Sequence, residues 1–203
     1  MNRLPRRRAL AHHRTSVYHA RLLRPARARC AAYERGEFGM VPGTGDQHEV
    51  PEWARGDPLM EWYSTQVWGK RAPDDDALFE VMCLQVFQAG LTWRMILARR
   101  DAFRAAFNDW RIDDVAEMGS GSIERLVKDP SIIRNRRKIE ACVTNAGVIQ
   151  RIREQHGSFC RWFYDVIPGD DLPSIQRTLR STFAFMGPEI ARMWLGASGR
   201  IEL

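Results

Sequence analysis

The sequence predicts an all-α domain of roughly seven to nine short helices, which follows a basic N-terminal extension. Three observations lead to this prediction. From about residue 59 onward, apolar residues recur at the spacing of a helix. Residues typical of helix starts and ends interrupt that pattern at regular intervals. No segment alternates apolar and polar residues in the way a half-buried strand would.

The first predicted helices lie in residues 59–128. The segment "DDDALFEVMCLQVFQAG" (74–90) opens with acidic residues suited to a helix N-terminus. It is apolar on nearly every side, so we expect a central, buried helix. The next segment, "WRMILARRDAFRAAFNDW", pairs Phe103 with Phe107 one helical turn apart. Short helices are predicted over 112–118 and 122–128.

The second half of the chain contains the longest predicted helix. The segment "NRRKIEACVTNAGVIQRIREQHG" ends at Gly157, a residue typical of helix C-termini. Its apolar residues form one stripe: Ile139, Cys142, Val143, Ala146 and Ile149. Ser158 and Ser174 are expected to cap two further helices, and Pro188 fits the first turn of the last one.

The composition is that of a globular protein, with 44% apolar and 28% charged residues. No stretch approaches the roughly 18–20 apolar residues that a membrane span requires, and no secretory signal is expected. The four cysteines are widely spaced and form no CxxC pair. We therefore expect a reduced cytoplasmic protein, nucleoid-associated if its source is a prokaryote.

The positive charge is concentrated at the N-terminus. Residues 1–39 carry ten Arg, no Lys and two Glu, which is +8 and leaves −2 of the total of +6 for the remainder. Residues 1–55 are interpreted as a basic, poorly ordered extension, and residues 56–203 as the helical domain. The extension could be a phosphate-binding arm, an organellar leader, or upstream sequence translated from an early start, with Met40 as an alternative start.

Several kinds of catalytic site are disfavoured by the residues present. His156 and Cys160 have the spacing of helical metal ligands, but the helix end at Gly157 separates them. Cys83 lies within an apolar helix, where packing is a better explanation than nucleophilic catalysis. No glycine loop of a known phosphate-binding type is found.

The segment "RLVKDPSIIRNRRKI" (125–139) is more informative, because it predicts a helix, a tight hairpin and a second helix. Cations gather at the start of the second helix, where they oppose the helix dipole. An anion bound at the backbone N–H groups there would offset this conflict, and a duplex phosphate is such an anion. A solvated basic face on an ordinary helix is the alternative.

Two long stretches, "LFEVMCLQVFQAGLTWRMILARRDAFRAAF" and "IIRNRRKIEACVTNA", resemble the 3-methyladenine DNA glycosylase I family of the helix-hairpin-helix superfamily. The QAGLTW block, the Arg-rich helix after it and the hairpin occur in the family's order and spacing. "WYSTQVWGKRAPDDDALFE" and, more loosely, "STFAFMGPEIARMWLGASG" resemble the family's first and last blocks. The resemblance covers about residues 60–199.

The resemblance implies a helix-hairpin-helix glycosylase fold and a monomer that flips an alkylated adenine out of double-stranded DNA and hydrolyses its N-glycosidic bond. Gly90 and Leu91 would form a wedge that fills the gap left by the base. Trp93 would stack on the extruded cationic base, and Tyr63 and Trp68 would line the same pocket. The hairpin would hold the DNA backbone through Ser131, Arg134, Arg136, Arg137 and Lys138. Because alkylation already weakens the bond, positioning and electrostatics would supply the acceleration.

The sequence departs from this family at two places. The family's base-recognising, catalytic Glu falls at Gln85, whose amide has one acceptor and one NH₂ donor but no charge. This change predicts that the protein prefers a cationic base less strongly, by about 1.5–3 kcal/mol, or roughly tenfold to a hundredfold. The family's zinc site ties its termini together through Cys and His, but Ser64 stands in place of one His and the terminal His and Cys are missing. We expect no zinc and no other cofactor.

Three hypotheses follow. The first is a DNA repair glycosylase with weak or retuned activity on alkylated purines. The second is a non-catalytic helix-hairpin-helix module that binds damaged or distorted DNA. The third is a purely structural helical protein, in which Leu91 and Trp93 are core residues that happen to follow a turn.

Overall fold

A computed structural model describes residues 50–168 and 171–203. The chain divides into two units, Met1–Gln47 and His48–Leu203. The first unit lies outside the described residues, so the predicted nature of the basic extension stays a prediction. The described part is helical and contains no strand, which confirms the predicted all-α class.

Ten α-helical segments occur in the described residues, slightly more than predicted, because three of them are five residues long or shorter. The longer ones are α2 (Pro58–Gln66), α3 (Asp75–Gln88), α5 (Arg100–Ala106), α7 (Ser120–Lys128), α8 (Arg136–His156), α10 (Leu172–Thr182) and α11 (Pro188–Ala197). The short ones are α4 (Trp93–Leu97), α6 (Ile112–Ala116) and α9 (Phe159–Arg161). Two 3₁₀ turns, η2 (Glu52–Ala54) and η3 (Asn108–Trp110), and one π turn, η4 (Trp162–Val166), complete the set. None of the described helices combines the length and apolar character that crossing a membrane demands.

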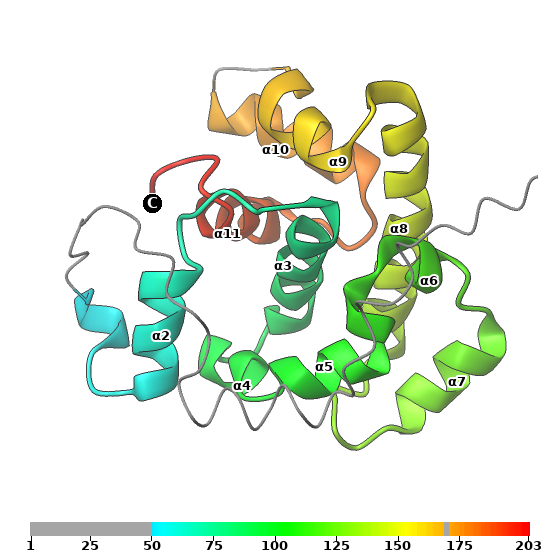
Figure 1. Ribbon diagram of the computed structural model, residues 1–203, viewed down its shortest axis with the longest axis horizontal. Helices are drawn as coiled ribbons and strands as arrows, with labels where there is room; N and C mark the ends of the chain where they lie inside the picture. The colour runs from blue at the N-terminus through cyan, green and yellow to red at the C-terminus, as the bar shows by residue number, and fades with distance from the viewer. Residues whose placement is uncertain (1–49, 169–170) are drawn as a thin grey trace, which may run out of the picture. The chain divides into compact units, whose positions relative to one another are not determined.

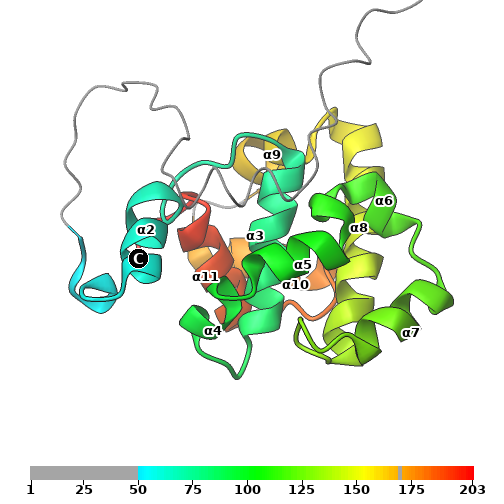
Figure 2. The same cartoon turned by 60° about the horizontal axis from the view of Figure 1, so that its bottom comes forward.

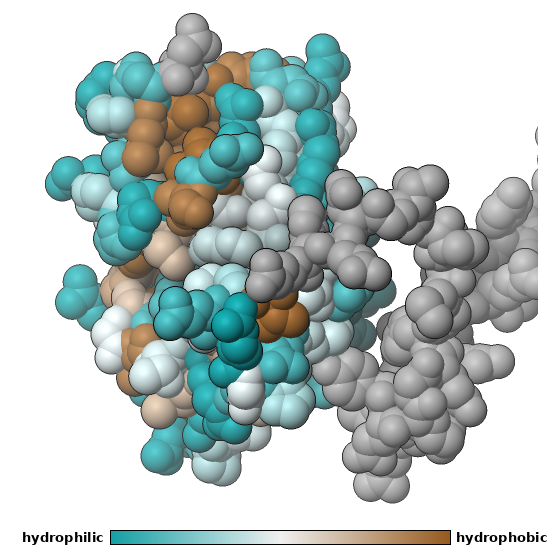
Figure 3. Space-filling view, turned by 90° about the vertical axis from the view of Figure 1, so that its left-hand side faces the viewer, coloured by the Kyte–Doolittle hydropathy of each residue, from teal (hydrophilic) through white to brown (hydrophobic). Residues whose placement is uncertain are grey.

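Helix α3 is the centre of the domain, as its apolar sequence predicts. Figures 1 and 2 both show it between α8 on one side and α2 and α11 on the other. Its side chains Leu78, Phe79, Met82, Val86 and Phe87 have no exposed surface. Burying one such side chain contributes about 1.5–3 kcal/mol, so α3 supplies much of the hydrophobic stabilisation. On the face seen in Figure 3, apolar residues gather mainly in one patch in the upper part of the view, and hydrophilic residues surround it.

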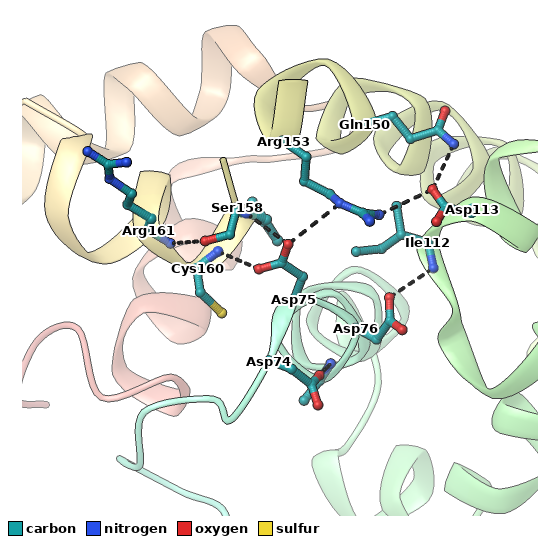
Figure 4. A network of polar contacts seen from close by, with 12 residues as sticks. Asp74, Asp75, Asp76, Ile112, Asp113, Gln150, Arg153, Ser158, Cys160 and Arg161 are labelled. Atoms are coloured by element: carbon teal, nitrogen blue, oxygen red, sulfur yellow. Dashed lines mark hydrogen bonds and ion pairs between the residues drawn. The ribbon is translucent and has the colours of Figure 1, made fainter. Parts of the chain in front are cut away.

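The aspartates that open α3 each cap a different helix (Figure 4). Asp74 is the N-cap of α3 itself, because its Oδ1 accepts from Ala77 N at 2.8 Å. Asp76 accepts from Ile112 N, the first residue of α6, at 3.0 Å. These bonds satisfy N–H groups that have no partner inside their own helices.

Asp75 serves a third helix. Its two oxygens accept from Phe159 N at 3.0 Å and from Cys160 N at 2.8 Å, at the start of α9. Its Oδ2 also lies 3.7 Å from Nε of Arg153, on α8. Asp75 therefore joins α3, α8 and α9 through one carboxylate (Figure 4).

Three of the four residues predicted to start or end helices do so. The helices predicted over 112–118 and 122–128 are observed as α6 and α7, with bounds that differ by two residues at one end each. Gly157 ends α8 with φ of +86°, Ser158 caps α9 through Arg161 N at 3.0 Å, and Pro188 is the first residue of α11. Ser174 is not a cap. Asp171 takes that place and accepts from Ser174 N at 2.9 Å, because the helix begins three residues earlier than predicted, at Leu172.

Candidate active site

Three aromatic residues predicted to bind a base lie together in the structure. Tyr63 comes from α2, Trp68 from the segment after it and Trp93 from the first turn of α4. The ring of Tyr63 lies 5.0 Å from that of Trp93 and 6.0 Å from that of Trp68, between centroids. These distances are typical of contacting aromatic pairs, so the three rings form one cluster.

Trp53 is a fourth member of this cluster that the sequence interpretation missed. Its ring lies 5.8 Å from Trp68 and 6.5 Å from Tyr63, and 49% of the residue is exposed. The helical domain was predicted to begin at residue 56, so Trp53 was assigned to the extension. The Asp57–Pro58 sequence was an available signal, because it marks the start of a helix only four residues after Trp53.

A small cavity lies beside this cluster. Its volume is about 20 Å³, enough for about one water molecule and too small for a purine. The lining residues come mainly from α2, α3 and α4: Trp62, Tyr63, Val67, Glu80, Val81, Leu84, Trp93, Leu97 and Arg100. A base could enter only if some of these side chains moved.

Gln85 is not itself a lining residue, but it lies on α3 next to two residues that are. It follows Val81 by one helical turn and Leu84 by one residue, and positions four apart share a helix face. Only 2% of Gln85 is exposed, and neither atom of its amide group has a hydrogen-bond partner among the described residues. The Tyr63 hydroxyl and Trp93 Nε1 are also buried and unpartnered within that part of the chain. A buried polar group without a partner costs about 1–3 kcal/mol, so these groups suit a ligand better than the folded protein alone.

The one buried carboxylate at the cavity is already neutralised. Glu80 receives two hydrogen bonds from Arg100, at 2.7 and 3.2 Å, and one from Arg104 at 3.3 Å. Burial raises the pKa of the Tyr63 hydroxyl well above its usual value, so this group stays protonated at neutral pH. The site therefore offers neutral hydrogen-bonding groups and no unpaired negative charge.

The residues predicted to form a wedge lie in a tight turn, Gln88–Leu91, which we call the wedge turn. Ala89 has φ of −47° and ψ of 112°, and Gly90 has φ of +81°. Leu91 N donates to Gln88 O at 2.6 Å. These values define a type II β-turn, in which only glycine readily occupies the third position. Gly90 is exposed, and Leu91 is half-buried against the core.

The predicted hairpin joins α7 to α8 and is stabilised by Asp129. The Asp129 carboxylate accepts from the backbone N–H of Ser131 at 2.8 Å and from its hydroxyl at 2.6 Å. Arg134 and Arg137 are exposed, so their side chains are available to a phosphate. Ser131 is exposed too, but its hydroxyl and its N–H both donate to Asp129, so the phosphate contact predicted for it does not fit this structure. Arg136 is exposed too, but it is paired with Glu124 at 2.6 Å.

Lys138 requires a correction, because its place in the structure does not fit a phosphate contact. Only 5% of the residue is exposed. Its Nζ donates to Phe87 O at 2.8 Å and to Ala89 O at 2.6 Å, at the C-terminal end of α3. The basic sequence pattern was read as one surface, whereas the third residue of α8 points into the protein.

No zinc site is formed by the described residues. No group of three or more His, Cys, Asp or Glu side chains among them could hold a metal ion. Ser64, at the position of a family ligand, is buried and donates to Glu61 O at 2.9 Å. Cys83 is fully buried, and burial raises its pKa well above the usual value, which suits packing and not nucleophilic catalysis.

A family model for methyladenine glycosylase matches residues 53–202. The chain belongs to this family. The match begins at Trp53, which places the fourth aromatic residue inside the family domain and confirms the resemblance read from the sequence motifs.

Relatives and solved structures agree with this assignment. DNA-3-methyladenine glycosylase 1 of Escherichia coli (strain K12) is 41% identical over 105 residues, which are 52% of this chain and 56% of that protein. DNA-3-methyladenine glycosylase of Haemophilus influenzae is 38% identical over 84 residues, 41% of this chain and 45% of that protein. The chain thus spans about half the length of these curated relatives. A solved structure of 3-methyladenine DNA glycosylase I from Staphylococcus aureus, in a glutamate-to-glutamine variant, superposes with a TM-score of 0.67 and 30% identity, covering 74% of this chain and 90% of that one.

Proposed function

We propose that this protein is a DNA repair glycosylase that extrudes an alkylated purine from double-stranded DNA and hydrolyses its N-glycosidic bond. The observation that carries the proposal is the set of unpartnered polar groups at Gln85, Tyr63 and Trp93, beside an aromatic cluster and the wedge turn. A structural protein gains nothing from burying these groups without partners.

Each group has a role in binding an extruded base. The Gln85 amide can accept from the amino group of an adenine through Oε1 and donate to a ring nitrogen through Nε2, the pairing that glutamine makes with adenine in DNA recognition. Trp93 offers a ring for stacking, which also attracts a cationic base. The Tyr63 hydroxyl stays protonated and can donate or accept one further hydrogen bond.

The DNA would be held outside the pocket. Gly90 and Leu91 would enter the gap left by the base, since apolar side chains inserted into a duplex unstack its base pairs. The exposed residues Arg134 and Arg137 would contact phosphates and set the register of the protein on the duplex. Such an enzyme would act in the cytoplasm, on the DNA itself.

The reaction requires little acid catalysis. The bond between the base nitrogen and C1′ breaks, and its electron pair moves to the base. A base alkylated on a ring nitrogen is cationic, so it leaves as a neutral molecule. A water oxygen then bonds to C1′ and releases its proton to solvent. Holding the base and the water in the orientation that the reaction requires would supply the acceleration.

The proposal is tested by the release of free base from N-methylated duplex DNA. We expect the protein to release methylated purine and Gln85→Glu to increase its preference for the cationic base by roughly tenfold to a hundredfold. Gln155→Glu is the matched control, because it adds the same charge at an exposed position on the last turn of α8.

The outcomes separate the enzyme from a binding module. If neither the protein nor Gln85→Glu releases base, while a duplex with an abasic site is still bound, the enzyme proposal fails and the DNA-binding module stands. If no binding is seen either, the structural hypothesis stands. Leu91→Ala should weaken binding to the abasic duplex, and unchanged binding would contradict the wedge assignment.

A further inference from the structure

Lys138 links the two parts of the site that would contact DNA. It belongs to the first turn of α8, directly after the hairpin, where its own N–H donates to the Asn135 carboxamide at 3.3 Å. Its ammonium reaches the end of α3 and donates to Phe87 O at 2.8 Å and Ala89 O at 2.6 Å. A cation at a helix C-terminus satisfies carbonyls that have no partner in the helix and interacts favourably with its dipole.

The second of these carbonyls determines the shape of the wedge turn. Ala89 C=O belongs to the central peptide of the Gln88–Leu91 turn, between its second and third residues. Type I and type II turns differ by a flip of that peptide plane. The bond from Lys138 Nζ to Ala89 O therefore favours the observed type II turn and fixes where Leu91 stands relative to α8.

The surroundings hold the Lys138 side chain in place. Its Nζ lies 5.9 Å from the ring of Phe185, and Cζ of the neighbouring Arg137 lies 6.0 Å from the same ring. Phe185 adopts a left-handed backbone conformation with φ of +57°. The preceding residue, Ala184, is clamped by the fully buried Asn145, which accepts from its N–H at 2.8 Å and donates to its C=O at 3.1 Å.

We propose that Lys138 is a positioning residue that couples the hairpin to the wedge turn, so that gripping the DNA backbone sets the position of Leu91 for base extrusion. This inference rests on the proposed function. This positioning role takes the place of the phosphate contact predicted for Lys138 from the sequence, because the ammonium is buried and donates to the protein's own backbone.

The test compares Lys138→Met with Arg137→Met in the full chain. Met keeps the apolar stem of the lysine and removes both hydrogen bonds. Base extrusion in this variant should therefore fall roughly 10- to 100-fold, and kcat should fall by the same factor. Extrusion is measured by the fluorescence of 2-aminopurine placed beside the lesion. In Lys138→Met, neither the KM nor the salt dependence of binding to an abasic duplex should change. Arg137→Met should instead reduce the salt slope by about one and weaken binding to different duplexes alike, as expected when a phosphate contact is lost.

Two further measurements distinguish positioning from a general structural role. In Lys138→Met, the amide hydrogen of Leu91, which donates within the wedge turn, should exchange roughly tenfold faster or more. Gly90→Ala alters the same turn from its other side, so its effect on extrusion should not add to that of Lys138→Met. Lys138→Arg, which keeps the charge and the donors, should recover part of the extrusion.

The opposite results overturn the inference. Wild-type extrusion and Leu91 exchange in Lys138→Met would do so, as would a reduced salt slope in that variant. If Lys138→Met does not fold, Lys138→Gln takes its place with the same readouts, and failure of both to fold would assign Lys138 to folding alone. Exchange and 2-aminopurine fluorescence need no bond cleavage, so the inference can stand even if no base is released and the proposed enzyme function fails.

Discussion

The two ends of α3 differ in how their polar groups are used. At the N-terminal end, Asp74, Asp75 and Asp76 each accept from backbone N–H groups, and together they cap three helices. Near the C-terminal end, Gln85 is buried with its whole amide unpartnered among the described residues. One end therefore stabilises the fold, and the other retains hydrogen-bonding capacity that the fold does not use.

This difference has a thermodynamic consequence. Each unpartnered buried group at the C-terminal end destabilises the fold by about 1–3 kcal/mol, and the caps at the other end help to offset it. Sites that bind ligands commonly trade stability for activity in this way. Removing a capping acceptor at the N-terminal end should therefore lower stability, whereas removing the unpartnered amide near the C-terminal end should raise it.

The largest expected effect is at Asp75. Asp75→Ala removes the acceptor of two N–H groups at the start of α9 and the ion pair with Arg153, and we expect the free energy of unfolding to fall by about 3 kcal/mol. Urea unfolding followed by circular dichroism measures this. Asp74→Ala, which removes one exposed cap, is the matched control and should cost about 1 kcal/mol. Equal losses in the two variants would show that Asp75 is an ordinary cap.

The opposite sign is expected at Gln85. Gln85→Met replaces two unpartnered polar atoms by a thioether of similar size, so we expect the free energy of unfolding to rise by about 2 kcal/mol while base release is lost. The half-buried Gln88, on the same helix, is the control, and Gln88→Met should change stability by less than about 0.5 kcal/mol. A destabilised Gln85→Met would mean that the amide has partners in solution.

A smaller gain is expected at Tyr63. Tyr63→Phe removes one unpartnered hydroxyl from a fully packed ring, so the unfolding free energy should rise by about 1 kcal/mol. Binding of the base should weaken by no more than about tenfold, since one hydrogen bond between neutral groups is lost. Thermal unfolding and base-release kinetics test the two parts separately. A loss of stability in Tyr63→Phe would contradict the view that this hydroxyl is reserved for a ligand.

Much of the fold could be predicted because its signals are local. The apolar pattern of α3, the glycine that ends α8 and the proline that begins α11 all act on neighbouring residues. The Gln-Ala-Gly sequence at the end of α3 is a local signal of the same kind, although the wedge role of Gly90 and Leu91 came from the family resemblance. The aromatic cluster was predicted only through family motifs, since Tyr63 and Trp93 are 30 residues apart and nothing local shows that they meet.

What sequence reasoning could not supply were contacts between distant segments. Lys138 lies among four basic residues within "RNRRK", and composition alone cannot show that this one side chain turns inward to reach Ala89. Asp75 looked like part of a helix-start charge cluster, but the two N–H groups that donate to it lie more than 80 residues away. Trp53 was missed because the composition of the extension obscured the start of the domain.

The smallest expected effect is a pH dependence at Asp76. Burial raises the pKa of this carboxyl above its usual value of 3.8, although Ile112 N donates to it. The folded protein therefore binds a proton more tightly than the unfolded chain does. The contribution of Asp76 to stability is fully present below pH 3.8 and is lost as the pH rises through the raised value. Asp76→Asn keeps an acceptor for Ile112 N and removes the half-buried charge, so it should stabilise the fold at pH 7 by less than about 1 kcal/mol. Urea unfolding between pH 7 and about pH 4 should show this advantage shrinking as the pH falls towards the unfolded pKa.

An advantage of Asp76→Asn that grows on acidification would mean that the Asp76 carboxylate is stabilised by the network of Figure 4 and not penalised by its burial. In that case all three aspartates would act as charged caps, and the contrast between the two ends of α3 would be stronger than the buried carboxyl suggests.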